Sequence, residues 1–173
     1  MAKKITIELG KQSISDAIAQ IKAYRAEIKR KTERLAERIA NEISEAALFN
    51  FASAVCDDRV VGGSRPANVT IAVETAGDAR LVIASGEDAV FCEFGAGVTH
   101  NVPAGDSLHP NGVTLGMTIG SYGKGFGSRR VWGYYDDGGG LVLTRGTPAS
   151  MPMYNAMKTV CEQITTIAQE VFA

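Results

Sequence analysis

"ISDAIAQIKAYRAEIKRKTERLAERIANEISEAA", residues 14–47, decides the fold. Apolar residues recur every three or four positions, and neither Gly nor Pro interrupts residues 13–61. This spacing is typical of one amphipathic helix, which we predict over residues 13–55. About forty helical residues are roughly 60 Å long, whereas a globule of 173 residues is ~35 to 40 Å across. Part of the helix must therefore project or lie along something larger, unless it bends near residues 25–32. The recurring residues are Ile14, Ile18, Ile21, Ile28, Leu35, Ile39, Ile43 and Ala47.

The middle of this helix is highly charged, and its charges leave two interpretations open. Residues 22–38 contain seven Lys or Arg and three Glu. In the first interpretation they form a solvent-exposed face, stabilised by pairs such as Glu27 with Lys31 four residues apart. In the second, the helix is an arm that contacts another subunit. A nucleic-acid-binding stripe is disfavoured because the interleaved glutamates would oppose phosphate binding.

The composition indicates one globular domain over residues 1–173. The net charge of the chain is close to zero, so it favours no particular class of binding partner. The chain is 45% hydrophobic and 21% charged, and its net charge is −1. The odd set Cys56, Cys92 and Cys161 contains no C-x-x-C pair and is typical of reduced thiols in a cytoplasmic product. We expect no membrane span, because no apolar run approaches the ~18 residues that one requires.

The rest of the chain divides into further predicted elements of an α+β fold. "KKITIELG" alternates like a strand over 3–9, and the period-two pattern of 68–95 predicts an antiparallel meander with strands at 69–73, 81–84 and 89–94. Residues 95–140 hold 13 of the 19 glycines, so we predict a glycine-rich interaction loop over 96–130. A strand pair follows over 131–146. We expect the long N-terminal helix and the C-terminal helix to pack on one face of a single antiparallel sheet.

A C-terminal helix is predicted over residues 150–172. Ser150 is a plausible N-cap and Pro152 fits the first turn. One apolar stripe is expected to face the core. It consists of Met153, Met157, Val160, Ile164, Ile167 and Val171.

No catalytic or metal-binding constellation is evident in the sequence. His100 and His109 lie near Glu93, but their spacing fits no compact zinc motif. There is no G-x-S-x-G nucleophile elbow, and in "GSYGKGFG" the residue after Lys124 is Gly125 rather than the Ser or Thr of a phosphate-binding P-loop. We therefore predict a protein that is not an enzyme and has no cofactor and no metal.

The glycine-rich loop carries the residues that we predict to contact other molecules. Loops this long in small domains are usually disordered or serve as interaction elements. We expect this loop to be unnecessary for the core and to become ordered against a neighbouring subunit. An alternative is a nucleic-acid-binding module formed by the basic and aromatic residues of 122–130. The predicted interface residues are Tyr122, Lys124, Phe126, Arg129, Arg130 and Trp132.

Three segments together resemble one protein family. They are "FCEFGAGV" at 91–98, "GSYGKGFGSRRVWGYYDDGG" at 120–139 and "LTRGTPASMPMYNAM" at 143–157. Their order and spacing are similar to those of the tail-completion, or neck, proteins of long-tailed double-stranded-DNA bacteriophages, over roughly residues 15–172. The matching motif residues, Glu93, Phe94, Gly95, Gly97, Gly146 and Pro152, are expected to have structural roles. We expect Glu93 and Gly95 to end a central strand, and residues 146–152 to turn the chain into the last helix.

The resemblance implies a non-enzymatic ring between the capsid portal or connector and the tail, needed for tail completion or head–tail joining. Such a protein assembles in the host bacterial cytoplasm and remains in the virion as a minor structural component. The implied partners are other copies of the chain in a sixfold or twelvefold ring, the adjacent connector or stopper protein, and a tail-terminator or tail-tube protein. DNA would pass through the lumen of the ring without sequence-specific binding.

Overall fold

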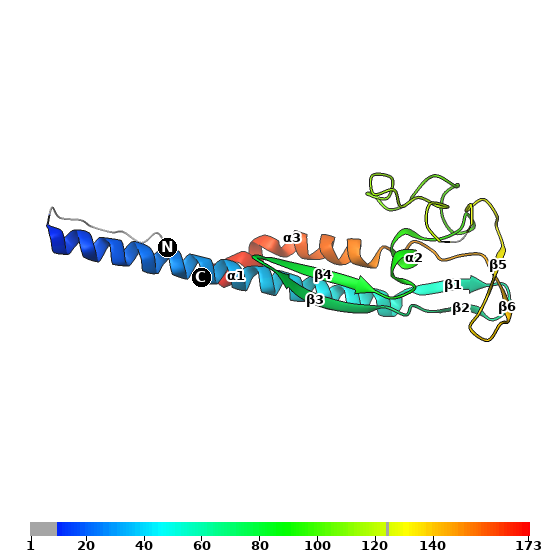
Figure 1. The fold of residues 1–173 in the computed structure, drawn as a ribbon, viewed down its shortest axis with the longest axis horizontal. Helices are drawn as coiled ribbons and strands as arrows, with labels where there is room; N and C mark the ends of the chain where they lie inside the picture. Colours follow the sequence, from blue (N-terminus) through cyan, green and yellow to red (C-terminus); the bar gives the residue numbers. More distant parts are fainter. Residues whose placement is uncertain (1–9, 124) are drawn as a thin grey trace.

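Helix α1, Lys11–Ser53, extends without a break along most of the molecule (Figure 1). The computed structural model describes residues 10–123 and 125–173, so the strand predicted at 3–9 lies outside the described residues. The 43 residues of α1 extend about 65 Å. The predicted long helix is confirmed, and the bend near residues 25–32 that would have shortened it is absent from α1.

Helix α3, Pro152–Phe172, covers only the C-terminal part of α1 (Figure 1). Its last residues reach the middle of α1, where the Lys31 ammonium donates to the Phe172 carbonyl at 3.1 Å. Arg38 forms an ion pair with Glu170 at 2.6 Å. Residues 11–28 of α1 therefore extend beyond α3, and we call them the arm.

A two-stranded hairpin lies along the same part of α1. Strands β3, Thr70–Ala76, and β4, Ala79–Ser85, pair antiparallel in unbroken register from Thr70 opposite Ser85 to Ala76 opposite Ala79. Ile71 and Ala84 pack on the core cluster formed by Phe51, Ala54, Cys56 and Cys92. This hairpin confirms the first two strands of the predicted meander.

A second, four-stranded sheet forms the end of the molecule remote from the arm (Figure 1). Its order is β2-β1-β6-β5, with every neighbouring pair antiparallel. The prediction of a single sheet is wrong: the α+β class holds, but the strands belong to two sheets. The strand bounds are Val55–Arg59 for β1, Gly63–Pro66 for β2, Trp132–Tyr135 for β5 and Leu141–Thr144 for β6.

The predicted strand at 89–94 is also wrong, because these residues form helix α2, Ala89–Phe94. The amide of Cys92 donates to the Asp88 carbonyl at 2.8 Å, and that of Gly95 donates to Phe91 at 2.8 Å. Helical spacing places Cys92 and Glu93 side by side in the interior, where both are buried. Period-two spacing would have pointed these neighbours to opposite faces. Glu93 and Gly95 therefore end a short helix rather than a central strand.

The apolar stripe of α3 is only partly covered. Val160 and Ile167 are buried, whereas Met157 and Ile164 are each 43% exposed, so their predicted core placement is wrong. The N-cap is Met151, in a left-handed conformation with φ 51°, and Ser150 instead donates its hydroxyl to the Cys92 carbonyl at 3.2 Å. The apolar face of α3 is wider than the surface that α1 covers, and the uncovered part remains exposed.

We predict that Ile167→Ala lowers the free energy of unfolding by about 2 to 5 kcal/mol, because Ile167 is buried and a cavity would remain. Ile164→Ala, on the same helix, is the control and should cost less than half as much, because its site is already open to solvent. Urea denaturation monitored by circular dichroism measures both. Equal losses would contradict the assignment of the buried face.

Candidate functional site

A cleft of about 1060 Å³ lies between the glycine-rich loop and the four-stranded sheet. Four predicted interface residues, Tyr122, Phe126, Arg129 and Trp132, line it, so the fold brings them together. Arg130 is exposed and does not line the cleft, and Lys124 lies outside the described residues. Whether these residues contact a partner stays a prediction. The aromatic lining consists of Phe91, Tyr122, Phe126, Trp132, Tyr134 and Tyr135.

The glycine-rich loop packs on the body of the protein, contrary to the expectation that the core does not need it. Asn101 donates its side-chain amide to the carbonyls of Ala96, Gly97 and Thr147 and accepts the Ala149 amide at 3.0 Å. Further along the loop, Ile119 is buried. The described residues of the loop, 96–123 and 125–130, contain no helix or strand, as predicted, yet buried side chains such as Ile119 belong to the interior.

Tyr122 anchors the far part of this loop. Its ring lies 6.0 Å from that of Phe91 and 6.4 Å from that of Phe94, and its hydroxyl donates to the Gly95 carbonyl. Burial raises the pKa of the Tyr122 hydroxyl to about 12. Tyr122 therefore acts mainly as an intramolecular anchor, while Phe126, which is 91% exposed, is the free aromatic at the rim.

Three of the motif glycines allow the backbone to pass close to its neighbours. Gly95, Gly97 and Gly146 all have positive φ, as expected for glycine at turns. A Cβ on Gly97 or Gly146 would meet the Trp132 ring at 2.4 Å or 2.8 Å. The two segments also pair through a bridge between Ala96 and Thr147. The glycines therefore let Trp132 pack directly on the backbone beside the cleft.

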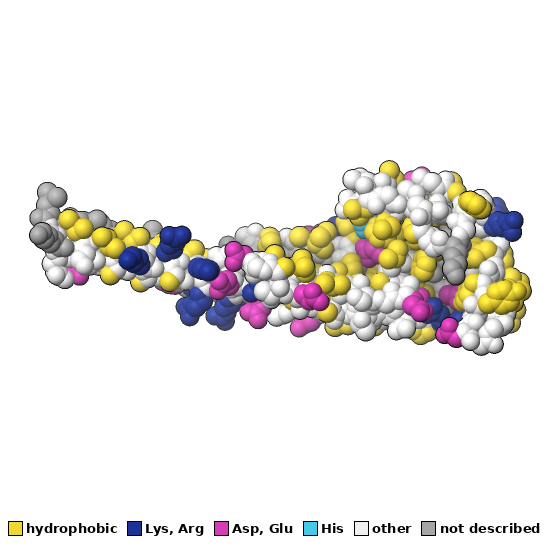
Figure 2. Space-filling model, viewed as in Figure 1, with side chains coloured by type: hydrophobic (Ala, Val, Ile, Leu, Met, Phe, Trp, Pro, Cys, Tyr) yellow, Lys and Arg dark blue, Asp and Glu magenta, His cyan; other side chains and the backbone are white. Residues whose placement is uncertain are grey.

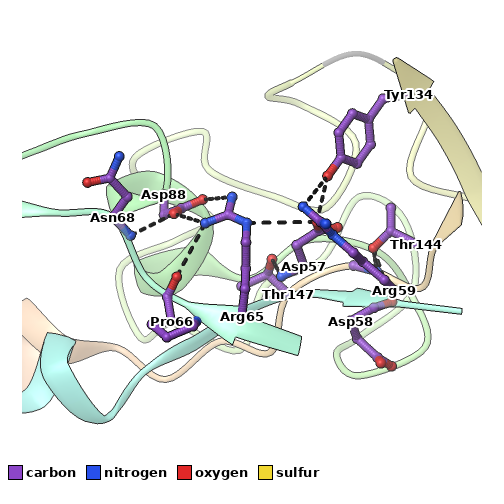
Figure 3. Close-up of polar contacts among 11 residues, drawn as sticks. Asp57, Asp58, Arg59, Arg65, Pro66, Asn68, Asp88, Tyr134, Thr144 and Thr147 are labelled. Atoms are coloured by element: carbon purple, nitrogen blue, oxygen red, sulfur yellow. Dashed lines mark hydrogen bonds and ion pairs between the residues drawn. The ribbon is translucent and has the colours of Figure 1, made fainter. Parts of the chain in front are cut away.

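A buried carboxylate, Asp57, organises the polar wall of the cleft (Figure 3). It accepts hydrogen bonds from the Tyr134 hydroxyl at 2.5 Å and from Arg59 Nε at 2.7 Å. Burial tends to raise the pKa of Asp57, but the hydrogen bonds from Tyr134, Arg59 and Thr144 outweigh it and leave the pKa below its usual value. Asp57 also has φ 54°, at the irregular position where β1 changes register with β2.

Arg65 and Asp88 form the second part of this wall (Figure 3). The guanidinium binds the carboxylate through two parallel contacts of 2.6 Å and 2.8 Å. Asp88 also accepts the backbone amide of Asn68 at 2.7 Å, which ties the start of the hairpin to the start of α2. The paired Asp88 carboxylate raises the pKa of Arg65, so this charge persists at any physiological pH.

The charged side chains of the wall form ion pairs with one another. Arg65 approaches Asp57 as well, at 3.9 Å, so the two acidic and two basic side chains form one connected set. In the described residues, no buried side-chain nitrogen or oxygen lacks a hydrogen-bond partner. Each of these four charges therefore has an oppositely charged partner, as buried charges require. The sequence does not reveal it, because "DDRVVGGSRPAN" at 57–68 contains glycines and a proline that are typical of a connection.

Glu93 joins α2, α3 and the loop. Its two carboxylate oxygens accept the backbone amides of Met153, at 2.8 Å, and Tyr154, at 2.9 Å, in the first turn of α3. The buried His109 of the loop donates Nε2–H to Glu93 at 3.2 Å, since its Nδ1 accepts the Asn111 amide. Pro152, first in the helix, needs no such acceptor because it has no N–H. Glu93 therefore supplies the cap that Ser150 was expected to provide.

The two histidines do not form a joint site. His100 pairs with Asp58 at 2.8 Å, whereas His109 pairs with Glu93. Across residues 10–123 and 125–173, no three His, Cys, Asp or Glu side chains are grouped so as to hold a metal ion. Neither α1 nor α3, the long helices of the described chain, has a stretch apolar enough to cross a bilayer.

No family model, curated protein or solved structure matches this chain.

We predict that Glu93→Gln lowers the free energy of unfolding by about 1 to 3 kcal/mol. Each oxygen of the Glu93 carboxylate accepts one backbone N–H of α3. A glutamine side chain has only one oxygen, so its NH₂ group would face the other N–H and could not accept from it. Chemical denaturation measures the loss, with Glu87→Gln at an exposed position as the control. An unchanged midpoint for Glu93→Gln would show that the cap is dispensable.

We also predict that Asp57→Asn lowers the free energy of unfolding by about 1 to 3 kcal/mol at pH 7. Because the native pKa of Asp57 is lowered, its ionised form stabilises the fold above the usual Asp pKa, near 3.9. That stabilisation is lost as the pH falls through the native pKa. The difference between variant and parent should therefore shrink below about pH 4. Denaturation at pH 7 and pH 3 tests this, with the exposed Asp78→Asn as the control; a pH-independent difference would contradict it.

Proposed function

We propose that this chain is a structural virion protein that forms a homo-oligomeric ring in the neck of a long-tailed bacteriophage, between the portal or connector and the tail. The observation that carries the proposal is the arm. It extends beyond α3 (Figure 1), and Ile14, Ile18 and Ile21 along it are 45%, 49% and 52% exposed. Ile28, at 37%, continues the same face. A contiguous row of exposed isoleucines supports a subunit contact.

The distribution of charge supports association between copies of the chain. Residues 11–38 carry eight Lys or Arg and four Asp or Glu, whereas residues 39–173 carry eight and fourteen. The N-terminal part of α1 is thus basic and the body acidic, and Figure 2 shows Lys and Arg beside the hydrophobic side chains of the arm. Attraction between unlike ends of two copies favours head-to-tail contacts, which form a ring when the rotation from copy to copy closes.

The cleft offers a second surface, which we assign to the adjacent rings of the neck. Phe126 at its rim is 91% exposed and Tyr135 is 76% exposed, so two aromatic anchors are available to a connector, stopper, tail-terminator or tail-tube protein. Arg59 and Arg65 beside the cleft are already paired with aspartates. This pairing favours a protein partner over a phosphate backbone there, and fits DNA that passes through the lumen without specific contacts.

The proposal predicts that the purified protein forms a closed ring of six or twelve copies. Ile14→Glu combined with Ile21→Glu should shift it to monomers, because two charges would interrupt the apolar row without removing a buried residue. Light scattering after gel filtration measures the mass, and negative-stain electron microscopy shows whether the particles are rings.

The matched control is Ala19→Glu combined with Ala26→Glu, two exposed positions with the same seven-residue spacing on the opposite face of the arm. This variant should keep the mass of the parent. A parent protein that stays monomeric at every concentration would refute the ring. Strong binding to DNA that weakens steeply with salt would instead favour the nucleic-acid-binding alternative.

A further inference from the structure

The β3–β4 hairpin has apolar side chains on both faces, and the described residues cover one of these faces. Ile71 and Ala84 lie on the face that packs on the core. Because successive side chains of a strand point to opposite faces, the residues next to them in sequence lie on the outer face. That outer face contains Leu81, which is 44% exposed, and the half-buried Ile83. Ala72, Ala76 and Ala79 share this face, as does Glu74 opposite Leu81, and all four are exposed.

In the part of the chain that the structure describes, this outer face is exposed along most of its length. Isolated hairpins are at best marginally stable in water, and they become stable when a helix or further strands pack on them. Here α1 packs along one face only (Figure 1). Small alanines beside Leu81 and Ile83 leave a shallow apolar surface on which a helix can lie closely.

The arm has matching dimensions. The row from Ile14 to Ile28 rises about 21 Å along the helix axis, and strands of seven residues are about 20 to 23 Å long. One face of the arm therefore fits the whole length of the hairpin.

The charges around the two surfaces are opposite. Lys22 and Arg25 are exposed along the arm, and the exposed Lys29 follows its last residue. On the hairpin, Glu74 lies on the outer face and Asp78 lies in the turn, and both are exposed. Ion pairs at the rim of such a contact guide association and fix its register.

The arm cannot reach the hairpin of its own chain. The hairpin packs on the C-terminal part of α1, and the arm is the continuation of that same unbroken helix in the opposite direction (Figure 1). A single helix cannot turn back onto a surface beside its own other end. The occupant that fits is the arm of a second copy.

We infer that the arm of one copy packs its isoleucine row on the outer face of the β3–β4 hairpin of the next copy. The inference rests on the proposed self-assembly and specifies its contact. Each hairpin is then enclosed between two helices, its own α1 and its neighbour's arm. Because two different surfaces meet, the contact can repeat from copy to copy.

Disulfide cross-linking tests this contact. Two proteins are made in a Cys161→Ser background, which removes the exposed native thiol and leaves Cys56 and Cys92 buried. One carries Ile18→Cys and the other Leu81→Cys; they are mixed and oxidised with copper phenanthroline. We expect a cross-linked dimer at least tenfold more abundant than in the control mixture of Ile18→Cys with Leu141→Cys. Leu141 is 61% exposed but lies in the remote four-stranded sheet.

The outcomes separate this inference from the proposed function. Rings with no cross-link above the control would overturn the arm-to-hairpin contact and leave the ring standing. A monomeric parent would refute both. As a second measurement, Glu74→Lys with Asp78→Lys should weaken association at least tenfold, and mixing this variant with Lys22→Glu, Arg25→Glu protein should restore it. Failure of the mixture to associate better than either variant alone would also overturn the contact.

Discussion

The carboxylate of Glu93 holds together the parts of this molecule that the chain order separates. It accepts two amides at the start of α3 and the ring N–H of His109 from the loop, while its own backbone belongs to α2. The N-terminus of a helix carries partial positive charge, so a buried carboxylate there is stabilised as the amides are satisfied. The direction in which α3 leaves the sheet, and hence its packing on α1, depends on this junction.

The length of α1 sets the second constraint. Helix α3 and the hairpin pack only on its C-terminal part, and Ile14, Ile18 and Ile21 of the arm are exposed. The hairpin also has an exposed apolar surface, because α1 packs on one of its faces and the outer face remains exposed. These two surfaces, with their opposite charges, form the physical basis of the proposed assembly.

The cleft shows how a site with many polar residues can be chiefly structural. Asp57, Arg59, Arg65 and Asp88 satisfy one another, and Tyr134 adds its hydroxyl. Gly97 and Gly146 bring the backbone against Trp132. These contacts stiffen the wall and leave the exposed aromatics at the rim for a partner.

By itself the sequence determined the elements whose periodicity is long and regular. The spacing of isoleucines predicted α1, the stripe after Pro152 predicted α3, and residues 146–152 predicted the turn into that helix. Only the tertiary structure decided that residues 89–94 are a helix, that the strands form two sheets, and that Ile164 faces solvent while Ile167 is buried. Five apolar residues and a glutamate fit a strand or a helix equally well locally. An apolar stripe on α3 that is wider than the surface packed on it leaves the buried side undefined. Contacts between distant segments make those choices, because the capping of α3 by Glu93 and the pairing of Arg65 with Asp88 can form only after the chain has folded.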